Sequence, residues 1–186
     1  MRIAVYSGSF DPLHIGHRAI LECLSADRRF DWTYLVVSPQ NPFKDPEKAV
    51  TASRRYADAV EALRRCPGLY ASADDIELGM EPPQYTVNTL DALCAREPGN
   101  EFTLVIGADN LHGLAGWHEA GRLLAEYCIA VYPRTGYDPA SDTELLRASF
   151  RDVRGISLLD APIVDISSTR IREGMAAGLD MSRYMM

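Results

Sequence analysis

Residues 7–17 read Ser-Gly-Ser-Phe-Asp-Pro-Leu-His-Ile-Gly-His, and this stretch decides the fold. It follows the apolar run 3–6, which predicts a buried strand, and precedes residues 18–24, whose apolar spacing predicts a helix. Two histidines, His14 and His17, therefore open a helix just after a strand and a turn of small residues. A helix N-terminus carries free N–H groups and the positive end of a dipole, so this junction favours phosphate. The imidazoles add donors that stabilise charge building on a phosphoryl group.

The spacing of these histidines argues against a metal site. Zinc-binding helices use His-Glu-x-x-His, with i, i+4 spacing, whereas His14 and His17 are at i, i+3 with no third ligand adjacent. The chain has no G-x-x-x-x-G-K-[ST] and no G-x-G-x-x-G after a strand, which disfavours a P-loop enzyme and an NAD-dependent dehydrogenase. We therefore predict a phosphate-handling site and no metal ligands from the protein.

The rest of the chain alternates between strand-like and helix-like segments. Strands are expected at residues 2–6, 33–38, 70–72, 102–107, 128–132 and 156–159. Helices are expected at residues 14–24, 52–65, 86–96, 118–125, 143–150 and 168–177. Several strand segments are continuous apolar runs, as in parallel strands buried on both faces. This order predicts an α/β fold, a doubly wound Rossmann-like parallel sheet with helices on both faces, in a single domain over residues 1–186.

Three segments of interest each follow the end of an expected strand. Residues 7–17 follow the first strand, residues 41–44 the second and residues 107–110 the fourth. Ligands in such sheets bind beyond the carboxyl ends of the strands, so we expect the three segments to share one site. At the helix ends, we expect Thr51 to cap the second helix, Tyr85 or Thr86 to start the third and Gly178 to end the last.

Composition limits the partners. The chain has 186 residues, 47 % hydrophobic and 24 % charged, with a formal net charge of −7. An acidic protein is a poor generic nucleic-acid binder, so a phosphorylated small molecule must meet a local basic pocket. No signal peptide or apolar run of membrane length is visible, so we expect a cytoplasmic protein without membrane contact. The cysteines lie far apart in apolar contexts, which predicts buried free thiols: Cys23, Cys66, Cys94 and Cys128.

Four blocks of sequence resemble a known family. The pattern G-x-F-D-P-x-H-x-G-H of residues 8–17 resembles the signature of the HxGH nucleotidylyltransferase superfamily, and residues 165–172 resemble its I-S-S-T-x-I-R motif. Residues 84–90 and 106–110, the latter followed by Trp117-His118, narrow the resemblance to bacterial nicotinate-mononucleotide adenylyltransferases. The likeness runs from residue 1 to residue 183, with the four blocks in the family's order. Family members continue into another short helix, so we expect that helix to be missing after Met186.

The resemblance implies adenylyl transfer from ATP to nicotinate mononucleotide, giving deamido-NAD and pyrophosphate. No protein nucleophile is needed because the attacking phosphate is already an anion, so catalysis rests on positioning and charge stabilisation. The residues implied in catalysis are His14, His17 and Arg172. Those implied in ATP binding are Gly8, Ser9, Phe10, Asp109, Ser167, Ser168 and Thr169.

Several of these residues have a plainer alternative role. Phe10 is an aromatic residue of the kind usually found in a core, which is the alternative to a ring that stacks on a ligand. One of the hydroxyls in Ser167–Thr169 is expected to cap the helix that starts there. Asp109 is also placed to cap a short helix. We keep these alternatives beside the roles that the resemblance implies.

Recognition of the second substrate is implied for four residues. Trp117 is expected to stack on the pyridine ring, and Thr86 to present its backbone N–H to the ring carboxylate. Lys44 and Arg134 are expected to meet substrate phosphate. ATP phosphates require Mg²⁺, which we expect to be held by phosphates and water because no carboxylate cluster offers a cage. The partners expected are these two substrates, with a homo-oligomer possible.

Two positions depart from the family pattern, and two other functions stay open. Asn88 stands where the family often has Asp, and Ser7 where it often has Gly. A sister HxGH transferase would use nicotinamide mononucleotide or phosphopantetheine. A catalytically silent protein would bind the nucleotide without transfer.

Overall fold

In the computed structural model, which describes residues 1–39 and 47–186, a six-stranded sheet has the order β3-β2-β1-β4-β5-β6. Every pairing in it is parallel, and the chain order reverses between β1 and β4. The strands are β1 (Arg2–Gly8), β2 (Trp32–Val37), β3 (Ala71–Asp74), β4 (Glu101–Gly107), β5 (Cys128–Tyr132) and β6 (Gly155–Leu158). The predicted doubly wound fold is confirmed.

The α-helices fall at most of the expected places. They are α1 (Ile15–Ala26), α2 (Glu47–Arg64), α3 (Thr86–Arg96), α4 (Ala108–Gly113), α5 (Ala120–Glu126), α6 (Pro139–Ser149) and α7 (Ser168–Ala176). Short 3-10 helices lie at Ile76–Gly79, Leu114–Gly116 and Ser182–Tyr184. None of the helices in the described ranges is both long and apolar enough to cross a membrane.

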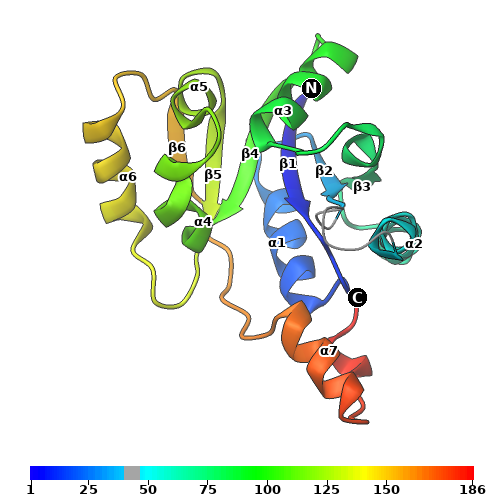
Figure 1. The fold of residues 1–186 in the computed structure, drawn as a ribbon. Coiled ribbons are helices and arrows are strands. Elements are labelled where there is room, and N and C mark those ends of the chain that lie inside the picture. The colour runs from blue at the N-terminus through cyan, green and yellow to red at the C-terminus, as the bar shows by residue number, and fades with distance from the viewer. Residues whose placement is uncertain (40–46) are drawn as a thin grey trace.

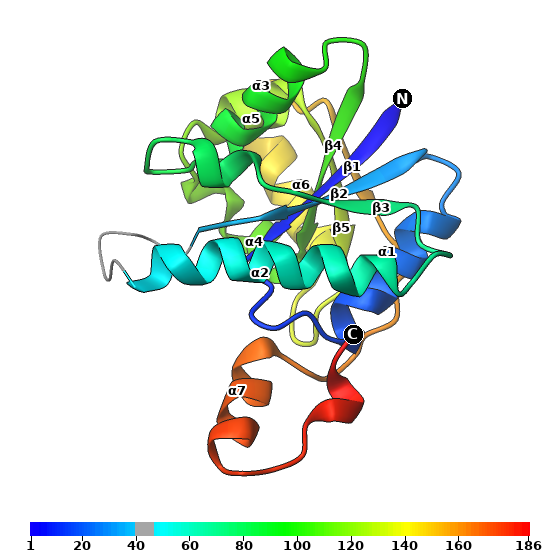
Figure 2. The same cartoon turned by 90° about the vertical axis from the view of Figure 1, so that its right-hand side faces the viewer.

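Helices cover both faces of the sheet because side chains alternate along each strand. In β1, Ile3 and Val5 belong to one buried core with residues of α3, α4, α5 and α6. Ala4 and Tyr6 belong to the other core with residues of α1 and α2. Helix α7 lies beyond the carboxyl end of β1, outside these two layers (Figure 1). The turned view shows α7 below the sheet in the same way (Figure 2).

The structure corrects two expected helix ends and confirms two others. Thr51 does not cap α2, because that helix begins at Glu47 and Thr51 lies inside it. Helix α6 starts earlier than expected, since the Asp138 carboxylate accepts N–H bonds from its first turn and Pro139 opens it. Tyr85 is the N-cap of α3, and Gly178 follows α7 with a φ of +74°, both as expected.

The first strand is longer than expected and includes part of the 7–17 segment. Ser7 and Gly8 pair with Val36 and Val37 in β2. The turn that follows therefore starts at Ser9, directly at the carboxyl edge of the sheet. This placement sets the start of α1 next to the ends of the neighbouring strands.

Candidate active site

The two histidines cap α1 with their side chains. His14 is the N-cap, and its Nδ1 accepts a hydrogen bond from the Gly16 N–H at 3.1 Å. The His17 Nδ1 accepts one from the His14 N–H at 3.2 Å. The rings stack with centroids 3.7 Å apart and planes 25° apart. Because each Nδ1 is an acceptor, each neutral ring carries its proton on Nε2, which leaves two N–H donors side by side.

Both rings are neutral at physiological pH. Burial lowers the pKa of His14 to about 4, assisted by the positive charge of Arg134. Burial lowers the pKa of His17 to about 3, with His14 and Arg134 acting in the same direction. The pair therefore offers hydrogen-bond donors to an anion, with the positive charge supplied by the nearby arginine.

Gly16 is required for this cap. A Cβ at position 16 would lie 3.0 Å from His14 Nδ1 and Cε1, and 3.4 Å from Ile166 Cγ2. Any larger residue would push the His14 imidazole away from the backbone N–H of residue 16, whose hydrogen bond it accepts. The glycine between the histidines thus has a packing reason in the structure.

Phe10 belongs to the core, which confirms that interpretation for its ring. Its side chain is buried, at 4 % exposure, and its ring meets Tyr6 and His17 edge to face with centroids 5.4 and 5.1 Å apart. Phe10 has a φ of +46°, so the chain turns sharply here to place the ring under His17. Gly8 makes room for it, since a Cβ there would lie 3.0 Å from the ring.

Arg134 lies at the carboxyl end of β5, between the histidines and Asp109. Its Nε lies 3.7 Å from Asp109 Oδ1, and its guanidinium covers the Tyr132 ring at 5.1 Å. The Nε atom is buried with no hydrogen-bond partner among the described residues. Gly107 at the end of β4 allows this arrangement, because a Cβ there would overlap the Asp109 carboxylate. Asp109 lies in the first turn of α4, whose N-cap is Gly107, so the capping alternative for Asp109 is wrong.

A cavity of about 390 Å³ lies beside these residues, lined by Asp109, Arg134, Tyr137, Arg170 and the segment before α7. A smaller cavity of about 20 Å³ adjoins it and is lined by His14, His17 and Arg134 among others. Arg134 lines both cavities, together with the histidines in the smaller one and with Asp109 in the larger one. Its volume falls within the range of small-ligand sites. Sequence reasoning did not name Tyr137, and it expected the Arg170 side chain to be solvated.

The N-terminus of α7 is tied to the turn after β1. The Ser167 hydroxyl accepts the Arg170 N–H at 3.2 Å and caps the helix, as the plainer alternative stated. Ser168 Oγ donates to the Pro12 carbonyl at 3.1 Å. Arg172 donates to the Asp11 carbonyl at 2.5 Å and to Thr169 Oγ1 at 3.2 Å. Donors from residues 165–172 thus meet carbonyl acceptors from residues 8–17, and the Ser168 bond spans 156 positions of the chain.

Arg55 on α2 is a residue that sequence reasoning missed. Its side chain is 5 % exposed, and its guanidinium donates to the carbonyls of Ser9 and Ser38. It therefore joins the loops that follow β1 and β2. Its position on the buried face of α2 was the available signal, but an arginine in a polar helix normally indicates a solvated face.

Two of the residues expected to recognise the second substrate, Thr86 and Trp117, form a separate group, whereas Arg134 lies beside the histidines. Thr86 is the first residue of α3, whose N-cap Tyr85 makes no side-chain capping bond. Trp117 is half-buried, packs against the core of α3 and α5, and precedes His118, which stacks on Tyr85 with centroids 3.9 Å apart. The structure thus brings the two blocks together. Lys44 lies outside the described residues.

Comparison with known proteins decides the family. The cytidylyltransferase-like family matches residues 5–174. The chain belongs to this family. The match covers the second half of β1, both histidines, Arg134 and the first turns of α7, so all parts of the site described above lie within the cytidylyltransferase-like region.

Relatives of similar length support the assignment to the cytidylyltransferase-like family. A protein from Cytophaga hutchinsonii, named probable nicotinate-nucleotide adenylyltransferase, is 36 % identical to this chain over 92 % of this chain and 84 % of the relative. One of the same name in Flavobacterium psychrophilum is 37 % identical over 94 % of this chain and 86 % of the relative. A nicotinic acid mononucleotide adenylyltransferase from Plasmodium falciparum, solved with APC, matches the fold with a TM-score of 0.75. It is 18 % identical and covers 99 % of this chain and 90 % of that chain.

Proposed function

We propose that this chain transfers the adenylyl group of ATP to nicotinate mononucleotide. An oxygen of the mononucleotide phosphate attacks the α-phosphorus of ATP, a new P–O bond forms, and the bond to the β-phosphate breaks. Pyrophosphate leaves with the electron pair of that bond, and deamido-NAD remains. The relatives of nearly full length and of that name support this reaction.

One observation carries the mechanism: two neutral histidines present adjacent Nε2–H donors beside Arg134. The His14 and His17 donors are held by the backbone of α1 before any ligand arrives. Preorganised donors of this kind stabilise charge that develops on the transferring phosphoryl group. We assign both histidines to the α-phosphate, because the site supplies donors and a cation but needs no covalent nucleophile.

The other phosphates of ATP fit the N-terminus of α7. We assign Arg172, Ser168 and Thr169 to the β- and γ-phosphates, with Ser167 and the backbone of Gly8 and Ser9 close by. In the structure, Ser168 and Arg172 donate to the carbonyls of the turn after β1. A phosphate replaces those acceptors with a stronger, charged one. Phe10 contributes through its backbone, since its ring is in the core.

The adenosine and the mononucleotide take the remaining space. We assign the cavity of about 390 Å³ beside Asp109 to the adenosine. Arg134, with Lys44, meets the phosphate of the mononucleotide, whereas Thr86 and Trp117 hold the pyridine ring and its carboxylate. The free N–H groups at the start of α3 suit a carboxylate, which nicotinate has and nicotinamide lacks.

The donor set suits Mg²⁺ that arrives with ATP. Among residues 1–39 and 47–186, no group of three or more His, Cys, Asp or Glu side chains could hold a metal ion. Mg²⁺ is commonly held by substrate phosphates and water with one or two carboxylates, and Asp11 is the carboxylate on the turn that Arg172 contacts. The ion would neutralise part of the phosphate charge.

A product assay tests the proposal. The protein is incubated with ATP, Mg²⁺ and either nicotinate or nicotinamide mononucleotide, and dinucleotide and pyrophosphate are quantified together. We expect both products with the acid and a much lower kcat/KM with the amide. Preference for the amide would remove the acid assignment, and absence of dinucleotide from both would refute the transfer reaction.

A further inference from the structure

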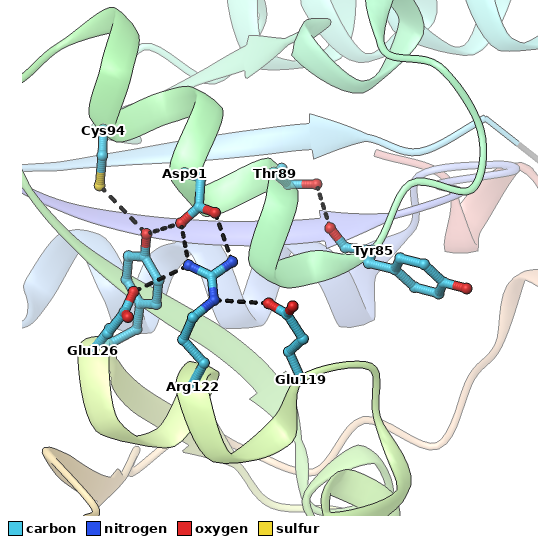
Figure 3. A network of polar contacts seen from close by, with 8 residues as sticks. Tyr85, Thr89, Asp91, Cys94, Glu119, Arg122 and Glu126 are labelled. Carbon is cyan, nitrogen blue, oxygen red and sulfur yellow. Dashed lines mark hydrogen bonds and ion pairs between the residues drawn. The ribbon is translucent and has the colours of Figure 1, made fainter.

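A network of ion pairs joins α3 to α5 beside the proposed pyridine site (Figure 3). Arg122 on α5 binds Asp91 on α3 through two hydrogen bonds, of 2.7 and 3.1 Å. The same carboxylate accepts the Tyr127 hydroxyl at 2.7 Å. Arg122 also donates to Glu119 at 2.7 Å and to Glu126 at 3.2 Å. Three carboxylates thus surround one guanidinium, and two of them raise its pKa, Asp91 most and then Glu119.

Glu119 is the residue where the chain turns from the Trp117-His118 segment into α5. It has a φ of +51° and a ψ of +38°, the left-handed region that residues other than glycine rarely adopt. Its side chain is held by Arg122, so the arginine restrains the turn itself. The segment with Trp117 enters α5 through this turn, so the direction of that segment depends on the contact between Glu119 and Arg122.

A second contact fixes the other side of the same segment. His118 stacks on Tyr85 with ring planes 18° apart. The Tyr85 backbone is held in turn, because its carbonyl accepts a bond from the Thr89 N–H at 3.1 Å, while the Thr89 hydroxyl donates to Glu77 at 2.9 Å. The start of α3, with Thr86, and the segment with Trp117 are thus joined at two places.

Stability alone does not explain a network of this density. The Arg122 and Asp91 side chains are 35 % and 41 % exposed, and ion pairs at such positions stabilise folded proteins little. A bidentate arginine contact, in contrast, defines both distance and orientation between two helices. We therefore interpret the network as one that fixes the position of α5 relative to α3.

We propose that Asp91 and Arg122 are positioning residues for the mononucleotide. Without touching substrate, their ion pair holds Trp117 opposite the N-terminus of α3, so that ring stacking and carboxylate binding occur together. This inference rests on the proposed function for the identity of the substrate. Because a displaced Trp117 loses part of its stacking on the pyridine ring, we expect Arg122→Met to raise the KM for nicotinate mononucleotide about 10-fold. The KM for ATP and kcat should stay within about 2-fold, because the ATP residues lie on other elements.

The kinetic test uses four variants with matched chemistry. Arg122→Met and Asp91→Asn break the pair, Arg122→Lys restores the charge, and Arg64→Met removes an exposed arginine that pairs with Glu61 on α2. We expect partial rescue by lysine and parental kinetics for Arg64→Met. A rise in both KM values together, or no rise for either pair-breaking variant in folded protein, overturns the proposal.

A spectroscopic test does not depend on turnover. The chain has two tryptophans, so Trp32→Phe leaves Trp117 as the only tryptophan. In that background we expect Arg122→Met and Asp91→Asn to increase acrylamide quenching of Trp117 by about 2-fold over the Arg64→Met control, with unchanged far-UV circular dichroism. Equal quenching in all variants overturns the positioning role. If the parent forms no dinucleotide, the proposed reaction fails, and the quenching result still decides whether the ion pair places Trp117.

Discussion

The histidines at the start of α1 combine a structural and a chemical role in one ring. Nδ1 of each accepts a backbone N–H group, so Nε2 carries the proton and is the atom left for a ligand. The sequence predicted that His14 and His17 open the helix, but it did not predict that their rings cap it. Capping by histidine escapes prediction because serine, threonine, aspartate and asparagine are the residues normally preferred there.

His17→Ala should reduce kcat by about 10²–10³-fold, the usual effect of removing one preorganised donor. The dissociation constant for ATP should change only a few-fold, because Arg172, Ser168 and Thr169 remain. The measurement is steady-state kinetics with a parallel ATP titration. His112→Ala, at an exposed histidine that contacts Asp142, serves as the matched control. Near-parental turnover of folded His17→Ala protein would contradict the assignment.

Acid should destabilise the folded chain through His17. Its folded pKa of about 3 lies below the ordinary value of 6.5, so between these values the unfolded chain binds a proton that the folded chain does not. The free energy of unfolding therefore falls as the pH drops below about 6.5, and we expect a loss of about 1–2 kcal/mol by pH 5. Urea unfolding of the parent and of His17→Gln across this range isolates the contribution. Parallel pH profiles for the two proteins would count against it.

Among the elements, those with strong periodicity were predicted best. The bounds of α3 and β5 are the predicted ones, because each is a clear apolar pattern with a defined start. Helix α4 was missed as a helix because its six residues, Ala108–Gly113, are too few to show a period. The early start of α2 was missed because Thr51 was interpreted as its N-cap, whereas the helix begins at Glu47. Pairing of α7 with the turn after β1 required three-dimensional information, since no local pattern encodes it.

At the level of α1, Gly16→Ala should impair catalysis more than stability. The added methyl meets the His14 ring at 3.0 Å and displaces it from its capping position, although alanine favours the helix. We expect kcat to fall at least about 10-fold, because a displaced donor stabilises the transition state less well than a preorganised one. Gly121→Ala is the control, since its added methyl makes only ordinary contacts with Phe150 at 3.6 Å. Unchanged kcat in Gly16→Ala with intact folding would show that the ring tolerates the methyl.

Helix α2 should depend on Arg55 for its connection to the loops. Arg55→Met leaves the carbonyls of Ser9 and Ser38 without this donor, which should cost about 1–3 kcal/mol of unfolding free energy. The neighbouring Arg54 is exposed, so Arg54→Met should be neutral within about 0.5 kcal/mol. Denaturant unfolding of both variants measures the difference. Equal stability of the two would mean that the buried guanidinium is dispensable.

For the whole molecule, the two substrates are assigned to separate regions around one sheet edge. ATP at 100 times its dissociation constant should stabilise the fold by about 2.7 kcal/mol, in the parent and in Trp117→Ala alike. Nicotinate mononucleotide should raise the melting temperature of the parent but not of Trp117→Ala. Thermal melts with each ligand alone make the comparison. Loss of the ATP effect in Trp117→Ala would show that the regions are not independent.

Strand β1 lies between both cores, with Ile3 and Val5 in one and Ala4 and Tyr6 in the other. Its amide protons therefore exchange with solvent only when the entire domain opens. Among the described residues, neither core includes a side chain of α7, whose ties to the turn after β1 are single hydrogen bonds. Amide protons of α7 should exchange through local opening, far faster than those of β1. We therefore expect the proposed binding region to join a slowly opening strand to a rapidly opening helix, so bound ATP should slow amide exchange in α7.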